Sequence, residues 1–185
     1  MHEKDIFIRQ ILNRSHDHRK AMQLLSSANI PSQMIVVLRQ ELDSMVRVIY
    51  LLSQEPSRQT LLIEASVNGQ QWQQSNGRGR VTDREMVELA QQLQGWTKSV
   101  YKFGCAFIHL SNFHDYNNRD PMKQLSAEEQ EAILEHCRHY HGGPEHSGFT
   151  NLIPYLPKVL EKVASNLEHY LALLQEGSQR QPTQI

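Results

Sequence analysis

The stretch from Ser32 to Gln54, SQMIVVLRQELDSMVRVIYLLSQ, carries apolar residues at the three- and four-residue spacing of a buried helix. Pro31 precedes it, and proline suits the first turn of a helix because it has no N–H to leave unpaired there. The stretch therefore predicts a strongly apolar helix with one stripe directed at a core. That stripe comprises Ile35, Leu38, Leu42, Met45, Ile49 and Leu52.

Helical periodicity also dominates the rest of the chain, and the alternation typical of strands is nearly absent. Thr82 with Glu85, and Ser126 with Glu129, form capping boxes, which mark helix starts. Residues 69–80, GQQWQQSNGRGR, have no apolar periodicity and predict a loop anchored by Trp72. The sequence predicts an all-α fold, a five- to six-helix bundle with one long central helix. We expect the helices near residues 4–28, 32–54, 58–67, 83–115 (the central one), 127–141 and 157–175.

The composition is that of an ordinary globular protein with one core, since 39% of the 185 residues are hydrophobic and 21% are charged. We expect one helical-bundle domain at residues 1–176 and a disordered tail at residues 177–185. The formal net charge of -1 excludes a global field that attracts nucleic acid. The longest mostly apolar run is too short for a membrane span. Cys105 and Cys137 fall in predicted helices, which favours free thiols and a cytoplasmic location without membrane contact.

Polar residues gather where the predicted central helix ends, in FGCAFIHLSNFHDYNNRDP, residues 103–121. At about 100° per residue, Ser111 and His114 continue the inner stripe and point to the core or to a cleft. His109 falls on the opposite side, where a histidine bonded to a carbonyl or carboxylate between helices is expected. His114 and Asp115 have a second interpretation, because an imidazole can cap the C-terminal end of a helix dipole.

Arg39 and Glu41 interrupt the apolar stretch at residues 32–54. A guanidinium near a core must be paired or must face a ligand. One interpretation is an Arg39–Glu41 pair that ties helices together, and the other is an Arg39 that faces Ser111 and His114 in a cleft. Asp43 and Arg47, in contrast, have the four-residue spacing of a surface ion pair.

The segment HCRHYHGGPEH, residues 136–146, holds four histidines and one cysteine. His136, His139 and His141 are its candidate metal ligands, but they lie on different faces of a helix, and no second ligand pair of fitting spacing follows. We therefore expect a histidine-rich helix end, and neither a metal nor another cofactor. Arg78, Arg80 and Arg84 form the one local basic cluster.

Two motifs carry a resemblance to a known family. LRQELDSMVRVIYLL, residues 38–52, and YKFGCAFIHLSNFHDY, residues 101–116, resemble the HEPN-type helical bundles of bacterial defence and toxin–antitoxin systems. The resemblance implies an α-helical bundle that commonly dimerises. Nuclease members carry an arginine, four to six spacers and a histidine; Arg9 and His16 have that spacing here, but in the first helix.

Two functions remain open from the sequence, and so does the question whether the protein is an enzyme. The first is a homodimeric binding module that contacts a protein partner or RNA in stress or phage defence. The second is a metal-independent ribonuclease with His114 as acid/base, Arg39 as phosphate clamp and Ser111 beside them. The ribonuclease requires Arg39 and His114 to approach each other in an open cleft. The binding module predicts Arg39 buried against a carboxylate and a His114 that only caps.

Overall fold

A computed structural model describes residues 2–177, and no strand occurs among them apart from one isolated bridge between Gln73 and Arg80. The predicted all-α fold is confirmed. The predicted tail at residues 177–185 lies outside the described residues except for Gly177. The α-helices are α1 (Glu3–Ser27), α2 (Pro31–Leu52), α3 (Pro56–Val67), α4 (Asp83–Gln94), α5 (Thr97–Ile108), α6 (Ala127–His141), α7 (Phe149–Leu152) and α8 (Leu156–Gly177). Short 3-10 helices are η1 (Asn112–Asp115), η2 (Pro121–Gln124) and η3 (Ile153–Tyr155).

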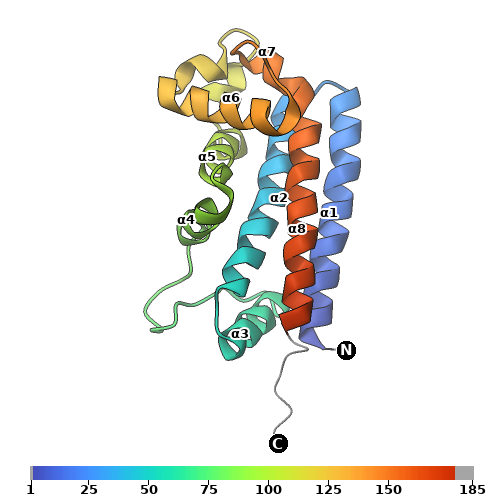
Figure 1. Cartoon of the computed structure of the whole chain (residues 1–185), viewed down its shortest axis with the longest axis vertical. Coiled ribbons are helices and arrows are strands. Elements are labelled where there is room, and N and C mark those ends of the chain that lie inside the picture. Colours follow the sequence, from blue (N-terminus) through green and yellow to red (C-terminus); the bar gives the residue numbers. More distant parts are fainter. Residues whose placement is uncertain (1, 178–185) are drawn as a thin grey trace, which may run out of the picture.

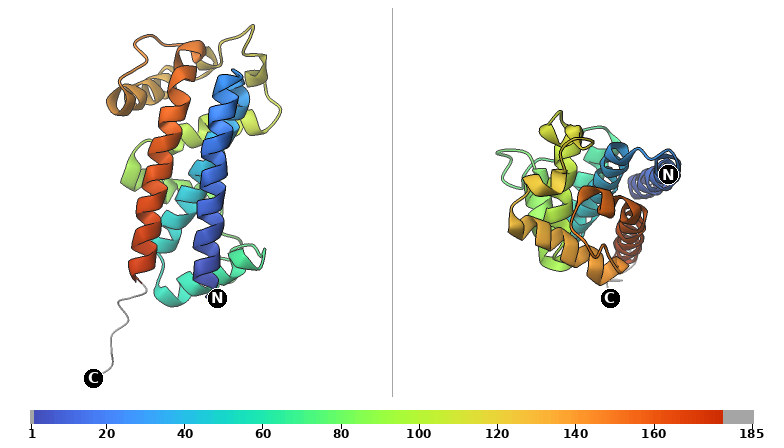
Figure 2. Two further views of the ribbon diagram at one scale, coloured as in Figure 1. Left: turned by 90° about the vertical axis from the view of Figure 1, so that its right-hand side faces the viewer. Right: turned by 90° about the horizontal axis from the view of Figure 1, so that it is seen from above.

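Helix α2 is the centre of the bundle. It packs against α1 and α8, which lie alongside it, and against α4 and α5 on another side (Figure 1). Helix α3 closes one end of these long helices, and α6 crosses the other end (Figures 1 and 2). The apolar stripe predicted for α2 is buried from Ile35 to Ile49, and Leu52 at its end is half-buried. Residues outside the stripe, such as Val46 and Val48, are buried too. A helix that is covered on several sides needs such an apolar circumference.

The single helix predicted for residues 83–115 is instead two helices, α4 and α5, followed by η1. The break is at Gly95, which has a φ of 67° and caps α4 by donating its N–H to the carbonyl of Gln91. Glycine adopts this left-handed conformation without the steric cost that other residues carry. The break turns Trp96 into the core, where it is 4% exposed.

Several local predictions are confirmed. Thr82 and Ser126 each form a complete capping box at the start of α4 and α6. Trp72 anchors the loop between α3 and α4: its indole N–H donates to the Ser66 hydroxyl at 2.7 Å, and its ring stacks on Tyr50. Among residues 2–177, no helix combines the length and the apolar character that crossing a bilayer requires.

Candidate functional site

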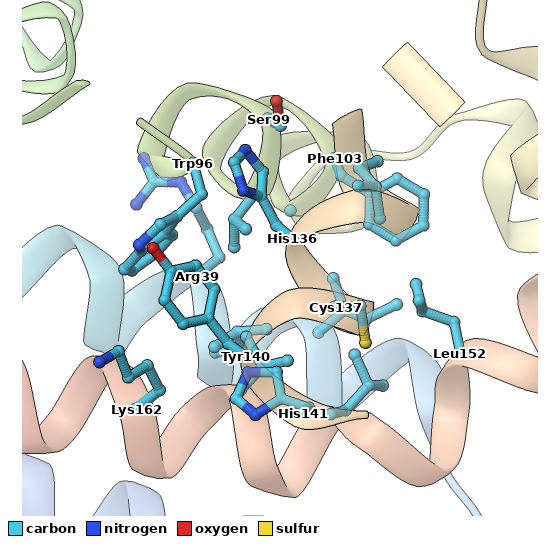
Figure 3. Close-up of a pocket in the computed structure, with 17 residues that line it drawn as sticks. Arg39, Trp96, Ser99, Phe103, His136, Cys137, Tyr140, His141, Leu152 and Lys162 are labelled. Atoms are coloured by element: carbon cyan, nitrogen blue, oxygen red, sulfur yellow. The ribbon is translucent and has the colours of Figure 1, made fainter. Parts of the chain in front are cut away.

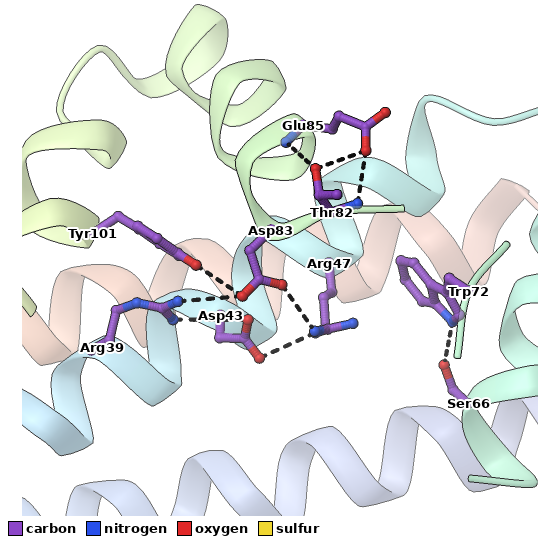
Figure 4. Close-up of polar contacts among 9 residues, drawn as sticks. All are labelled: Arg39, Asp43, Arg47, Ser66, Trp72, Thr82, Asp83, Glu85 and Tyr101. Atoms are coloured by element: carbon purple, nitrogen blue, oxygen red, sulfur yellow. Dashed lines mark hydrogen bonds and ion pairs between the residues drawn. The ribbon is translucent and has the colours of Figure 1, made fainter. Parts of the chain in front are cut away.

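Arg39 is held inside the bundle, with 7% of its side chain exposed. Its guanidinium lies 3.8 Å from Asp43 and 3.7 Å from Asp83, and its Cζ lies 3.4 Å from the centroid of the Tyr101 ring (Figure 4). Arg39 is thus buried against two carboxylates and an aromatic ring. The carboxylates belong to Asp43 and Asp83, and the predicted pair with Glu41 does not form.

Asp83, the first residue of α4, connects Arg39 to a larger group of charges. It also pairs with Arg47 at 3.4 Å and accepts a hydrogen bond from the Tyr101 hydroxyl at 2.9 Å (Figure 4). The predicted Asp43–Arg47 pair is confirmed at 3.1 Å. Burial, together with the hydrogen bond to Asp83, raises the pKa of Tyr101 well above its usual range although Arg39 opposes the shift. We call Arg39, Asp43, Arg47 and Asp83 the ion cluster; its two positive and two negative charges balance.

Glu41 belongs to a different polar group, on the side of α2 that faces α1. The residue is 1% exposed; its carboxylate accepts a hydrogen bond from the Ser15 hydroxyl at 2.5 Å and lies 2.5 Å from Nδ1 of His18. Ser15 and His18 were not predicted as site residues, because the residues around them in the sequence are polar on every side. Their spacing could have placed them on the buried face of α1, because positions 8, 11, 15, 18 and 22 follow one helical stripe. All five residues are buried.

Ser111 and His114 do meet, but through a local turn and not on a helical stripe. Ser111 caps η1: its hydroxyl accepts from the N–H of Phe113, and its own N–H lies 3.4 Å from Nδ1 of His114. The Ser111 hydroxyl also donates to the carbonyl of Ala106 at 2.7 Å. The hydroxyl and N–H of Ser111 and the Nδ1 of His114 are therefore all engaged in contacts within this part of the chain. Within residues 2–177, neither Ser111 nor His114 contacts Arg39, whose partners come from α2, α4 and the first half of α5.

The remaining predicted site residues lie at the surface. His109 is the exposed C-cap of α5, so the prediction that it packs between helices is wrong: α5 ends at Ile108, and residues 108–110 are all exposed. Asp115 is exposed, accepts from Asn118 at 2.7 Å and pairs with Arg119 at 3.5 Å. His139 is exposed on α6 with its ring against Tyr140. In the described part of the chain, no three histidine, cysteine, aspartate or glutamate side chains are placed to hold a metal ion.

His136 and His141 face a cavity of about 60 Å³ between α2, α5, α6 and α8 (Figure 3). Trp96 and Arg39 are among the lining residues, and each has one fully buried donor, Nε1 and Nε respectively, without a hydrogen-bond partner in the described structure. Leaving a buried donor unpaired costs about 1–3 kcal/mol. Burial, followed by the charges of nearby lysines, lowers the pKa of His141. The lining residues are Ile35, Leu38, Arg39, Trp96, Ser99, Val100, Phe103, Gly104, Ile133, His136, Cys137, Tyr140, His141, Leu152, Leu156, Val159 and Lys162.

A second hollow, of about 480 Å³, lies between α1, α2, α3 and the loop that precedes α4. We call it the arginine hollow, because Arg14, Arg47 and Arg80 line it. Arg47 belongs to the ion cluster, whereas the side chains of Arg14 and Arg80 have no ion pair or hydrogen bond within residues 2–177. Asp83 is the one carboxylate on its wall. The other lining residues are Phe7, Gln10, Ile11, Ser44, Ser66, Gln70, Gln71, Trp72 and Val81.

Comparisons of this chain with protein-family models, with curated proteins and with solved structures gave no match. The fold defines the class of protein, an all-α helical bundle. The features that bear on function are therefore the cavity beside α6, the arginine hollow and the polar groups around α2.

Proposed function

We propose that this protein is a non-catalytic binding module of the HEPN-like, stress- or phage-defence kind, and that its arginine hollow binds single-stranded RNA. The observation that supports this most directly is the pair Arg14 and Arg80. They come from α1 and from the loop before α4, face one hollow and lack a carboxylate partner within residues 2–177.

The charges around the arginine hollow favour an anionic ligand. The two arginines and two aspartates of the ion cluster neutralise one another, so Arg14 and Arg80 contribute about two uncompensated positive charges. A guanidinium presents a planar fork of donors that matches the oxygens of a phosphate. The hollow therefore has the charge and the donor geometry that a phosphate backbone requires.

The shape and the other polar groups favour RNA as the phosphate-bearing ligand. A hollow of about 480 Å³ is within the roughly 300–1,000 Å³ typical of ligand pockets and admits a splayed-out nucleotide. The hollow between three helices and a loop is open to solvent but too small for a duplex, whereas single-stranded RNA can place one nucleotide in it. The amides of Gln10, Gln70 and Gln71 add donors and acceptors that suit base edges and 2′-hydroxyls.

The ribonuclease alternative has weaker support from the geometry. Arg39 would have to leave Asp43 and Asp83 to clamp a phosphate, and breaking a buried ion pair costs several kcal/mol. Ser111 and His114 already satisfy each other and the turn that holds them. We therefore expect binding without cleavage.

We further propose that the chain works as a homodimer in the cytoplasm. The resemblance to HEPN-type bundles motivates the dimer, and the two free thiols, Cys105 and Cys137, motivate the reducing compartment. Size-exclusion chromatography with light scattering should give twice the mass of the chain. A mass of one chain at micromolar concentration would contradict the dimer and leave the RNA proposal standing.

The test of RNA binding is fluorescence anisotropy with a labelled single-stranded RNA, comparing the wild type with the double variant Arg14→Gln, Arg80→Gln. We expect affinity to fall by roughly tenfold or more and the salt dependence of log K to become shallower by about 1.4, the value for two lost phosphate contacts. The matched control is Arg119→Gln with Lys123→Gln, which removes two exposed charges near η1 and η2. The control should bind like the wild type.

Three results would overturn the proposal. The first is a wild type that binds no RNA at low salt, and the second is a control pair that weakens binding as much as the hollow pair. The third is cleavage of RNA by the wild type that disappears in His114→Ala, which would reinstate the ribonuclease.

A further inference from the structure

We propose that the hairpin-like loop at residues 72–81, which we call the finger, continues the RNA site beyond the arginine hollow. Arg78, near the tip of the finger, binds the phosphate that adjoins the nucleotide held in the hollow. This inference rests on the proposed RNA-binding function and adds to it the course of the strand outside the hollow.

The backbone of the finger folds back on itself. Val81 donates its N–H to the carbonyl of Trp72 at 2.9 Å, and Gln74 donates its N–H to the carbonyl of Gly79 at 2.8 Å. Gly77 and Gly79 have φ values of 67° and 141°, which glycine adopts at little steric cost. The connection between α3 and α4 consequently projects from the bundle (Figure 1).

The base of the finger is fixed to the bundle and forms one wall of the arginine hollow. Trp72 is buried there, and both Trp72 and Arg80 line the hollow. The Gln74 amide donates to the Glu85 carboxylate at 3.0 Å, and the Arg58 guanidinium of α3 donates to a backbone carbonyl of the finger. Arg80 is therefore held at the hollow, while the tip of the finger lies outside its lining.

Arg78 is an exposed cation without a partner. Its side chain has no ion pair or hydrogen bond within residues 2–177, and its backbone N–H donates to the side-chain oxygen of Asn76 at 2.8 Å. The finger contains two arginines and no aspartate or glutamate. Glu85, the carboxylate at its base, already accepts from Gln74. The guanidinium of Arg78 is thus open to an anion from solvent, and its fork of donors matches the oxygens of a phosphate.

The spacing along the finger suits neighbouring phosphates of one strand. The hollow of about 480 Å³ admits one nucleotide, so the rest of a bound strand lies outside it. Arg78 is two residues from Arg80, and two residues of chain span at most about 7 Å. One step of an extended single strand is of similar length. A strand that leaves the hollow along the finger therefore brings its next phosphate to Arg78.

The first experiment measures the binding of a labelled eight-nucleotide single-stranded RNA to Arg78→Gln by fluorescence anisotropy. We expect affinity to fall roughly three- to tenfold and the salt dependence of log K to become shallower by about 0.7, the value for one lost phosphate contact. Arg84→Gln is the matched control. It removes an exposed arginine of the same basic cluster, outside both the finger and the lining of the hollow, and should change affinity little.

The second experiment is limited proteolysis of the wild type with trypsin, which cleaves after arginine. Exposed loop tips are preferred sites of proteolysis, so the free protein should be cut after Arg78. RNA at ten times its Kd leaves about a tenth of the protein free and should slow this cut about tenfold. Cleavage after Arg119, which is exposed between η1 and η2, is the internal reference and should keep its rate.

The proposal is overturned if Arg78→Gln binds RNA as tightly as the wild type, or if Arg84→Gln weakens binding to the same extent. It is also overturned if bound RNA leaves the rate of the cut after Arg78 unchanged. Each of these results leaves the arginine hollow in place as long as the variant Arg14→Gln, Arg80→Gln binds RNA more weakly. A wild type that binds no RNA removes the hollow and the finger together.

Discussion

Gly104 lies directly against Arg39: a Cβ on residue 104 would stand 2.8 Å from Cβ of Arg39 and 3.1 Å from its Cγ and Cδ. Real side chains essentially never approach so closely, so α5 reaches α2 at this crossing because residue 104 has no side chain. The contact holds the Arg39 stem beneath α5, with the guanidinium over Tyr101 and the ion cluster beyond it. One glycine thus positions both the ion cluster and the wall of the apolar cavity.

Gly104→Ala should therefore destabilise the protein, although alanine is the better helix former. Overpacking of a tight core contact costs about 1–3 kcal/mol, which exceeds the roughly 1 kcal/mol that alanine contributes to helix propensity. Urea denaturation followed by circular dichroism measures the difference. Gly177→Ala is the control, because nothing lies within 4 Å of a Cβ there. A Gly104→Ala protein as stable as the wild type would show that α5 and α2 can separate freely.

Glu41 ties α1 to α2 through Ser15 and His18, and its removal should be costly. Glu41→Leu leaves the Ser15 hydroxyl and the His18 ring without their partner in a buried position. We expect a loss of about 3–5 kcal/mol in the free energy of unfolding, the range for breaking a buried polar pair from one side. Denaturant unfolding at fixed pH gives the value.

The double variant His18→Leu, Glu41→Leu separates this pair from simple packing. If the two side chains stabilise each other, the double variant loses less than the sum of the two single losses, by about 0.5–3 kcal/mol. Strict additivity would mean that the 2.5 Å contact contributes nothing beyond the two side chains taken alone.

Much of the fold could be predicted from the sequence because the patterns that determine it are local. The stripe of α2 and the capping boxes at Thr82 and Ser126 each involve residues within a few turns, and the structure has them as predicted. The break at Gly95 was missed for a physical reason. A lone glycine is tolerated inside a helix, and the apolar period continues across it, so periodicity alone cannot show a left-handed cap.

The polar sites depend on contacts that sequence spacing does not contain. Arg39 and Glu41 are two residues apart, so their side chains point about 200° apart around α2. A helical projection of the sequence therefore already argues against an Arg39–Glu41 pair. The actual partner, Asp83, is brought to Arg39 only by the packing of α4 on α2. The arginine hollow likewise combines Arg14 and Arg80, which are remote in sequence and converge only when the bundle folds.

Cys137 should react slowly with thiol reagents in the folded protein. Burial raises the pKa of its thiol to about 11. At pH 8, Cys137 therefore has about 100-fold less thiolate than a cysteine with the ordinary pKa. A more basic thiolate is also more nucleophilic, which offsets part of this effect. In the Cys105→Ser variant, we expect an aromatic disulfide reagent to modify Cys137 at least about tenfold more slowly in native protein than in urea. Equal rates would contradict the burial of this side chain.

His141 should make the bundle lose stability as the pH falls. Burial, and then the charges of Lys158 and Lys162, lower the pKa of His141 below the ordinary 6.5. The unfolded chain therefore takes up this proton first, and the free energy of unfolding decreases as the pH drops from about 6.5 through the lowered pKa of the folded state. His141→Gln, which cannot be protonated, should show a shallower loss of stability between pH 7 and pH 5 in thermal unfolding. An unchanged slope in His141→Gln would contradict the prediction. It would mean that His141 takes up a proton equally well in the folded and the unfolded protein, so that neither burial nor the nearby lysines oppose its positive charge.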